Sequence, residues 1–193
     1  METIIKKITH TEEDKKIYEQ AGQILRAGGL VAFPTETVYG LGADALDAKA
    51  SAKIYAAKGR PSDNPLIVHI ADVNALYDLA KEVPDKALVL AEKFWPGPLT
   101  MILKKKDKVP DSITGGLGTV AIRMPSHKVA AELIRTSGVY IAAPSANTSG
   151  KPSPTRASHV IKDLSGKIDM IIEDDTVDIG VESTIIDLSE EVP

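Results

Sequence analysis

Short apolar segments alternate with longer amphipathic segments along nearly the whole chain, and this alternation limits the fold more than any other sequence feature. The apolar segments are four or five residues long and bounded by turn residues, which is typical of buried strands. The segments between them carry helix signals, such as Asp47 before residues 48–58 and Gly59 after them. Thr11 and Asp14 likewise form a variant of the capping box. We expect strands at residues 4–8, 30–33, 66–70, 99–103, 120–124, 139–143, 169–172 and 184–188, and helices at residues 11–26, 47–58, 73–80, 85–94, 126–136 and 155–164.

Strands separated by helices of this length predict an α/β fold, with helices flanking a sheet. The strands at 99–103 and 120–124 have only a polar, glycine-rich connection between them, so we expect the sheet to be mixed. With 193 residues, of which 43% are hydrophobic and 26% charged, the chain is long enough to bury a core and has a globular composition. No internal repeat or low-complexity linker divides it, so we expect one domain over residues 1–193.

The charge balance and the absence of cysteine exclude several classes of protein. The formal net charge of -4 argues against a protein that mainly coats nucleic acid. The one dense positive run, at Lys104, Lys105, Lys106 and Lys108, is typical of a solvated turn or strand end. The chain has no cysteine, which excludes disulfides, zinc ribbons and thiol catalysis and fits a reducing compartment. Because no apolar run is long enough for a signal peptide or a membrane span, we expect a cytoplasmic protein.

Common nucleotide-binding and catalytic motifs are missing from the sequence. Gly150-Lys151 and Gly166-Lys167 lack both the preceding glycine pattern and the following Ser or Thr of a P-loop. Residues 40–45, GLGADA, superficially fit a dinucleotide fingerprint, but they do not directly follow their strand. Close packing of small residues is the favoured interpretation. The four histidines show no metal-ligand spacing, and no catalytic triad or nucleophile elbow can be identified.

Four stretches are too polar, and too strongly punctuated by glycine and proline, to be plain connections between elements. Each lies at one end of a predicted strand. In open α/β sheets the loops at strand ends converge on a shared crevice, so segments distant in sequence build one site. We therefore expect a single site formed by residues 34–45, 58–70, 115–125 and 143–155.

The side chains of these stretches suit the binding and orientation of anions. Lys58, Arg60 and Arg123 supply positive charge, and arginine binds carboxylate or phosphate through two parallel hydrogen bonds. Carboxylates are sparse, and the glycines within residues 115–118 allow the backbone to approach an anion closely. The structural alternatives are that Lys58 and Arg60 only complement a helix terminus, and that the hydroxyl residues only form turns and caps.

Six blocks, spread from about residue 20 to residue 188, carry a more specific signal. In chain order they are FPTETVYGLGADA, KGRPSDNPLIVHI, FWPGPLTMIL, TVAIRMPSH, APSANTSGKPSPT and VESTIIDL. In these blocks the chain resembles the YrdC/Sua5 family of threonylcarbamoyl-AMP synthases. Independent blocks that match in the right order are far more specific than a single motif.

The resemblance implies an α/β fold in which a twisted mixed sheet, flanked by helices, surrounds a positively charged cavity. It also implies a reaction in which L-threonine, bicarbonate and ATP give L-threonylcarbamoyl adenylate and pyrophosphate. The adenylate would feed the threonylcarbamoyl modification of adenosine 37 in tRNA through a downstream transferase machinery. Magnesium is expected on the ATP phosphates, with no direct protein ligand and no organic cofactor.

Roles for individual residues also follow from the resemblance. The family's Lys-x-Arg and Ser-x-Asn signature falls on Lys58, Arg60, Ser145 and Asn147. Lys58 and Arg60 are expected to hold the triphosphate and to act as catalytic residues. The other expected contacts with ATP are Asn64, Thr119, Ser145, Asn147 and Ser153. The expected contacts with L-threonine are Arg123, on its carboxylate, and Thr37, His69, Ser183 and the backbone of Ala143. For His69 the alternative is a buried histidine satisfied within its own strand.

Longer family members continue into a linker and a second domain after the last strand, whereas this chain ends at Pro193. We expect either a naturally short, single-domain member or a chain truncated at the linker.

The rival functional hypothesis is a double-stranded RNA or tRNA-binding module without catalysis, which the overall acidity and the few aromatic residues disfavour. A carbamoyl-transfer domain of the hydrogenase-maturation type is disfavoured because a cysteine-free chain of this length has no room for the zinc-finger and acylphosphatase segments of those proteins.

Overall fold

The computed structural model describes residues 2–174 and 177–190, and its strands form one mixed sheet flanked by helices. The strand order is β1-β8-β2-β3-β7-β4-β6-β5-β9. Four neighbouring pairs are parallel and four are antiparallel, which confirms the prediction of a mixed sheet. The strands are β1 (Ile4–Lys7), β2 (Val31–Pro34), β3 (Tyr39–Asp44), β4 (Ile67–His69), β5 (Leu99–Lys104), β6 (Thr119–Arg123), β7 (Ile141–Ala143), β8 (Met170–Glu173) and β9 (Thr184–Asp187).

The helices begin and end largely where their capping residues indicate. Asp47 accepts a hydrogen bond from the backbone N–H of Lys49 at 2.8 Å, and Gly59 ends the same helix in the left-handed conformation, with φ of 61°. At Thr11 the chain first makes a short 3-10 turn before its helix. The helices are α1 (Lys15–Arg26), α2 (Ala48–Lys58), α3 (Ala75–Leu79), α4 (Asp85–Phe94), α5 (Asp111–Thr114), α6 (Lys128–Ser137) and α7 (Ala157–Leu164), with the 3-10 turn at Glu12–Asp14.

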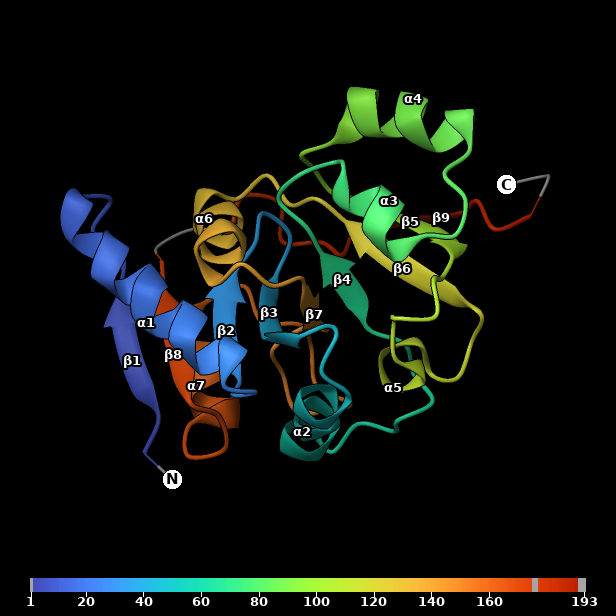
Figure 1. Ribbon diagram of the computed structural model, residues 1–193. Coiled ribbons are helices and arrows are strands. Elements are labelled where there is room, and N and C mark those ends of the chain that lie inside the picture. The colour runs from blue at the N-terminus through green and yellow to red at the C-terminus, as the bar shows by residue number, and fades with distance from the viewer. Residues whose placement is uncertain (1, 175–176, 191–193) are drawn as a thin grey trace.

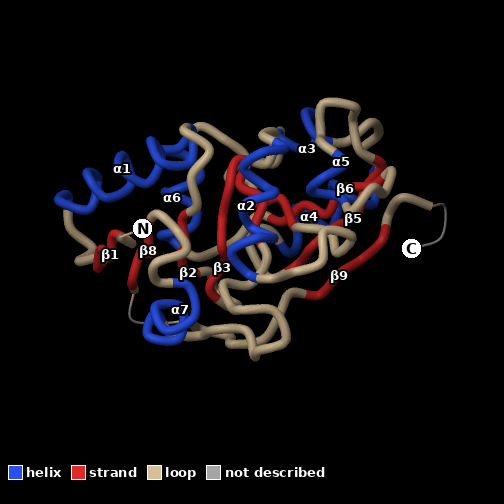
Figure 2. The backbone as a smooth tube through the Cα atoms, turned by 90° about the horizontal axis from the view of Figure 1, so that it is seen from below, coloured by secondary structure: helices blue, strands red, loops and turns tan. Residues whose placement is uncertain are grey.

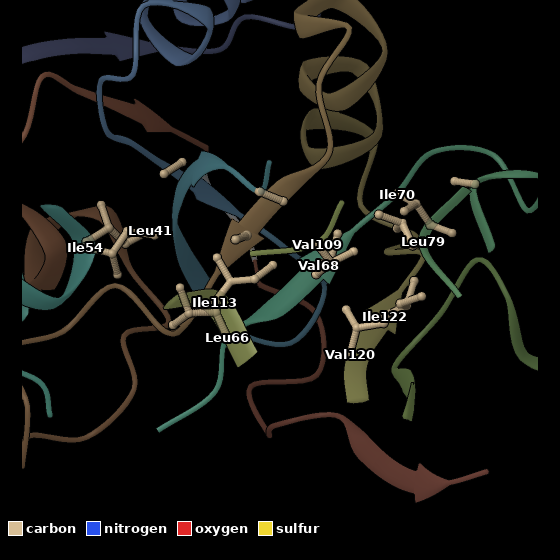
Figure 3. Packing of buried hydrophobic residues seen from close by; sticks show 14 of the residues in the cluster. Leu41, Ile54, Leu66, Val68, Ile70, Leu79, Val109, Ile113, Val120 and Ile122 are labelled. Atoms are coloured by element: carbon tan, nitrogen blue, oxygen red, sulfur yellow. The ribbon is translucent and has the colours of Figure 1, made fainter. Parts of the chain in front are cut away.

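Alternate residues of the central strands enter two hydrophobic clusters, one on each face of the sheet. On β2, Val31 and Phe33 pack in the cluster that includes α1 and α6, whereas Ala32 packs in the larger cluster on the other side. Figures 1 and 2 show α1 and α6 together on one face of β1, β8 and β2, with α7 on the opposite face. Figure 3 shows the larger cluster, in which side chains from α2, β4, α5 and β6 meet. Among the described residues, no helix combines the length and the apolar composition needed to span a bilayer.

Strand β3 was not predicted, because the segment PTETVYGLGADA was interpreted as a polar stretch at a strand end that contributes to a site. The glycines of this segment lower its strand propensity, so the sequence did not indicate a strand there. The structure requires one of them, since a Cβ at Gly42 would lie 2.6 Å from Cγ2 of Ile141 and 2.8 Å from Cε1 of Phe33. Residues 40–45 are therefore a closely packed strand and its end rather than a dinucleotide-binding turn, which confirms the interpretation as close packing. The short helix α5 was also not predicted.

Replacing Gly42 by alanine is expected to lower the free energy of unfolding by about 1–3 kcal/mol, because the added methyl overfills a packed core. Urea unfolding followed by circular dichroism measures the loss. Gly118→Ala is the matched control, since a Cβ at that position meets no heavy atom within 4 Å. Equal losses in the two variants would contradict the role assigned to Gly42.

Candidate functional site

A pocket of about 330 Å³ opens where the ends of β4, β6 and β7 meet the loops that follow β2 and α2. It brings together segments that are far apart in the sequence, as predicted from their positions at strand ends. Eight of the predicted site residues line it, namely Thr37, Arg60, Asn64, His69, Arg123, Ala143, Ser145 and Ser183.

The other four predicted residues do not line this pocket. Lys58 and Asn147 lie behind Ser145, where both side chains are buried. Thr119 is at the start of β6, paired with Lys104 of β5. Ser153 donates a hydrogen bond to Oε1 of Glu182 at 2.6 Å, and it is Glu182 that borders the pocket.

Arg123 is buried at the end of β6 and is held by three protein oxygens. Its Nη1 donates to Oγ1 of Thr37 at 2.9 Å, its Nε donates to the carbonyl of Gly97 at 3.3 Å, and its Nη2 forms an ion pair with Oε1 of Glu36 at 2.7 Å. Burial, the largest single effect, would raise the pKa of Glu36, but the Arg123 guanidinium together with backbone hydrogen bonds at Glu36 and Ser126 outweighs it, and the pKa is lowered. Two hydrogen bonds therefore orient the guanidinium at one wall of the pocket, whereas its Nη2 and the Glu36 carboxylate interact by charge, without a well-aligned hydrogen bond.

His69 contributes a neutral polar wall to the pocket. Burial, reinforced by the charge of Arg123, lowers the pKa of His69 from 6.5 to about 4. Its Nδ1 is 3.1 Å from the carbonyl of Ile67, so this nitrogen carries the hydrogen and donates it. The ring also packs edge-on against Phe33, with centroids 6.2 Å apart. At neutral pH the imidazole is therefore uncharged. His69 is a buried histidine with a hydrogen bond inside its own strand, and it also lines the pocket.

Arg60 and Asn64 belong to the loop between α2 and β4. The hydroxyl of Tyr55 donates toward the carbonyls of Asn64 and Ser112, at 3.2 and 3.0 Å, and fixes this loop against α5. Nη2 of Arg60 donates to the carbonyl of Pro65 at 3.3 Å, whereas its buried Nε has no hydrogen-bond partner among the described residues. Arg60 therefore presents a guanidinium with unused donors at the pocket.

Glu36 and Glu182 were not included among the predicted site residues, although both lie inside blocks used for the resemblance. The signal that could have identified Glu36 is its neighbour Thr37, because two adjacent residues of a tight loop reach the same arginine. Glu182 precedes Ser183, which was predicted. Its carboxylate adds a negative charge beside Arg60 at the edge of the pocket.

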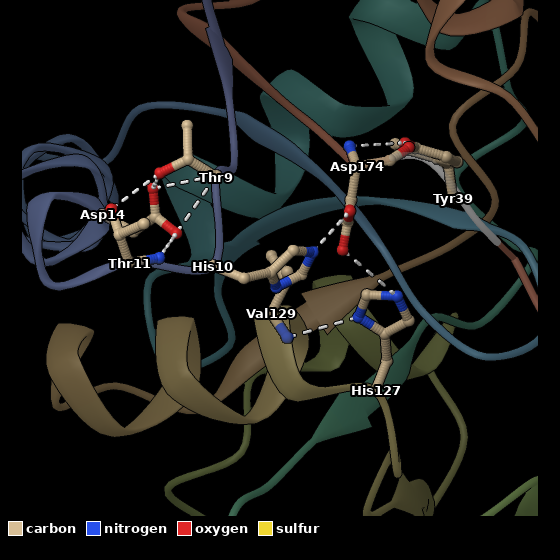
Figure 4. A network of polar contacts seen from close by, with 8 residues as sticks. All are labelled: Thr9, His10, Thr11, Asp14, Tyr39, His127, Val129 and Asp174. Atoms are coloured by element: carbon tan, nitrogen blue, oxygen red, sulfur yellow. Dashed lines mark hydrogen bonds and ion pairs between the residues drawn. The ribbon is translucent and has the colours of Figure 1, made fainter.

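The polar network of Figure 4 lies outside the pocket and joins the ends of β8 and β3 to α6. Oδ1 of Asp174 is 3.1 Å from Nε2 of His10, and Oδ2 is 3.8 Å from Nε2 of His127. The Tyr39 hydroxyl donates to the backbone carbonyl of Asp174 at 2.9 Å. Nδ1 of His127 accepts the N–H of Val129 and so caps α6. These contacts connect three elements and give the network a structural role.

A second groove and the lysine run at residues 104–108 give no support for a further site. A larger, open groove of about 1090 Å³ lies beside α1 and α6, but its charged residues are of both signs and none of the predicted site residues lines it. In the lysine run, the ammonium of Lys105 pairs with Asp111 at 2.9 Å and that of Lys108 lies 3.9 Å from Asp78. The run is thus partly neutralised, as expected of a solvated turn.

Replacing Glu36 by glutamine is expected to lower the free energy of unfolding by about 3–5 kcal/mol, because it leaves the buried Arg123 charge without a counter-ion. The matched control is Glu132→Gln, which breaks an exposed pair with Arg135 at 3.8 Å. That exposed pair should contribute less than about 1 kcal/mol. Urea unfolding at neutral pH compares the two, and a loss below that of the control would contradict the assigned pairing.

The stability of the fold should also depend on the protonation of His69. Because the pKa of His69 is about 4 in the folded chain and 6.5 for an unperturbed histidine, the unfolded chain binds more protons between these values. The stability present above pH 6.5 is therefore lost as the pH falls toward 4, by about 2–3 kcal/mol between about pH 7.5 and about pH 4.5. His69→Gln should remove this part of the pH dependence in urea unfolding, and an unchanged pH dependence would refute the assignment.

Comparison with known proteins identifies the family. Residues 23–193 match the Sua5/YciO/YrdC family model, which is described as telomere recombination. The threonylcarbamoyl-AMP synthase of Pyrococcus abyssi is 59% identical over 191 residues, which cover 99% of this chain and 56% of the relative. That of Bacillus subtilis is 58% identical over 175 residues, covering 90% of this chain and 51% of the relative. The chain thus spans about half the length of the curated relatives it matches.

Solved structures agree with this result. The structure of P. abyssi Sua5 complexed with L-threonine matches with a TM-score of 0.93 and 55% identity, over 99% of this chain and 55% of that one. Escherichia coli YciO matches with a TM-score of 0.84 over 98% of this chain and 91% of that one, but its 24% identity shows the fold alone. From the family match over most of its residues and from these relatives, the chain belongs to the Sua5/YciO/YrdC family.

Proposed function

We propose that this chain is an L-threonylcarbamoyladenylate synthase, which makes threonylcarbamoyl-AMP and pyrophosphate from L-threonine, bicarbonate and ATP. The observation that carries the proposal is the pocket with Arg60 and Arg123 in its lining, in a fold that matches a Sua5 complexed with L-threonine at 55% identity. Two guanidinium groups in one pocket suit two anionic groups, the carboxylate of an amino acid and the phosphates of a nucleotide.

The proposed reaction needs positioning and charge neutralisation more than covalent help from the protein. The threonine ammonium loses a proton, its nitrogen forms a bond with the carbon of bicarbonate, and water leaves to give a carbamate. A carbamate oxygen then attacks the α-phosphorus of ATP while the bond to pyrophosphate breaks. Preorganised donors that hold both reactants in line account for most of the acceleration in phosphoryl chemistry of this kind.

For the amino acid, we propose that Arg123 binds the carboxylate. The ion pair with Glu36 and the bond to Thr37 support this role, because they hold the guanidinium in one orientation. The remaining wall of this subsite is formed by polar groups that can recognise a hydroxyl. These groups are Thr37, His69, Ser183 and the backbone of Ala143.

For the nucleotide, we propose that Arg60 neutralises phosphate charge, since its unused guanidinium donors lie at the pocket. The residues proposed to complete the nucleotide site are Asn64, Thr119, Ser145, Asn147 and Ser153.

Magnesium fits this site as a companion of ATP. Glu182 is the one carboxylate among the described residues that line the pocket, and no cluster of three or more His, Asp or Glu side chains in the described chain suits a metal. A Mg²⁺ ion bound mainly by phosphate oxygens and water would supply positive charge to the triphosphate. We further propose that the product serves adenosine 37 of tRNA through a downstream transferase, in the cytoplasm.

Pyrophosphate release from ATP with bicarbonate and Mg²⁺ tests the proposal. We expect release with L-threonine and at least roughly 100-fold less with L-valine, because valine leaves the hydroxyl-recognising groups unpaired. Arg60→Ala should lower the rate by roughly 100-fold, as the loss of one preorganised charge donor does elsewhere. The product must be confirmed as an adenylate by mass spectrometry.

The absence of threonine-dependent release, together with no binding of L-threonine in calorimetry, would overturn the synthase proposal. A salt-dependent affinity for double-stranded RNA that survives Arg60→Ala would then favour the nucleic-acid-binding alternative.

A further inference from the structure

Lys58 is the last residue of α2, and its side chain is only 1% exposed. An ammonium has three N–H donors, and one loop supplies three oxygen acceptors for them. These are the carbonyl of Ser145, the carbonyl of Asn147 at 2.6 Å and Oδ1 of Asn147 at 3.3 Å. Every donor of this ammonium therefore has a partner within the protein.

The main chain of Lys58 binds the same loop. Its carbonyl accepts the backbone N–H of Ser149 at 2.9 Å. Asn147 extends the arrangement, because its Nδ2 donates to the carbonyls of Thr148 and Lys151 at 3.1 and 2.7 Å. Ser145, at the start of this loop, lines the pocket. Lys58 thus determines the path of the loop that forms one wall of the pocket, without lining the pocket itself.

Arg60 is only two residues away and differs in each of these respects. Gly59, with φ of 61°, turns the chain between them, and Arg60 lies at the pocket. One weak hydrogen bond, from Nη2 to Pro65, occupies its guanidinium, and its buried Nε has no partner in the described chain. Lys58 could contact a phosphate only by leaving the carbonyl oxygens of the half-buried Ser145 and the buried Asn147 unpaired, which is unfavourable.

We propose that Lys58 is a positioning residue, which shapes the loop of residues 145–149, and that of the two cations Arg60 alone neutralises the phosphates of a bound nucleotide. The inference rests on the proposed function for the identity of the ligand. It separates two residues that were expected to act together as one clamp on the triphosphate.

The test compares Lys58→Met with Arg60→Met, which remove the same charge from two neighbouring positions. Titration calorimetry measures the dissociation constants of ATP, ADP and AMP. Arg60→Met should weaken ATP binding at least roughly 10-fold more than AMP binding, because it removes a charge-assisted bond to phosphate. Lys58→Met should weaken the binding of ATP, ADP and AMP by the same factor, to within about twofold. A displaced loop changes the shape of the pocket and does not distinguish nucleotides by their number of phosphates.

Hydrogen exchange measured by mass spectrometry supplies a readout that does not depend on the ligand. In Lys58→Met the amides of Ala146 and Ser149 should exchange at least roughly 10-fold faster than in the unsubstituted chain, and in Arg60→Met they should not. Asn147→Ala, which removes one acceptor of the ammonium, should give the same pattern if Lys58→Met does not fold.

An ATP-selective loss in Lys58→Met, with unchanged exchange of the loop, would overturn the positioning role. Unchanged exchange and unchanged nucleotide affinity in Asn147→Ala would overturn it as well. If the unsubstituted chain binds neither nucleotide nor L-threonine, the proposed function fails, whereas the exchange data still decide whether Lys58 positions the loop.

Discussion

The buried ion pair between Arg123 and Glu36 is the interaction on which the geometry of the pocket depends. A guanidinium at the end of a central strand is costly to bury unless its charge and its donors find partners. Here the partners come from two different segments, the loop after β2 and the turn at Gly97, so the requirement to satisfy one side chain also holds these segments against β6. The ion pair lies between the apolar core and the pocket.

The turn at Gly59 explains how neighbouring cations acquire different surroundings. Helix α2 ends at Lys58 with a left-handed glycine, and the chain reverses there. The lysine side chain consequently binds the loop after β7, whereas the arginine side chain lines the pocket. A Lys-x-Arg spacing in a strand would place both side chains on the same face. At this helix terminus the same spacing separates the two side chains, so Arg60 lines the pocket and Lys58 does not.

The sequence was informative wherever a local signal decides the structure. Asp47 and Gly59 predicted both ends of α2, and the convergence of strand ends predicted a pocket that includes Arg60 and Arg123. It was uninformative where distant residues decide. Gly42 weakens the local case for a strand, yet Ile141, almost a hundred residues later, and Phe33, on the neighbouring strand β2, leave no room for a side chain there. The burial of Lys58 is likewise set by a loop almost ninety residues later.

The wall of the pocket formed by β9 differs physically from its floor. Ile185 of β9 and Ser183, which directly precedes this strand, line the pocket; β9 is an edge strand with a single neighbour, β5, and its side chains are mostly exposed. Arg123 and His69 lie on interior strands that have neighbours on both sides. Local opening costs least where few buried contacts are lost, so we expect opening of the edge strand to cost less free energy than opening of the floor. Such an asymmetry gives the pocket a rim that opens at lower cost than the floor, whose side chains define its shape.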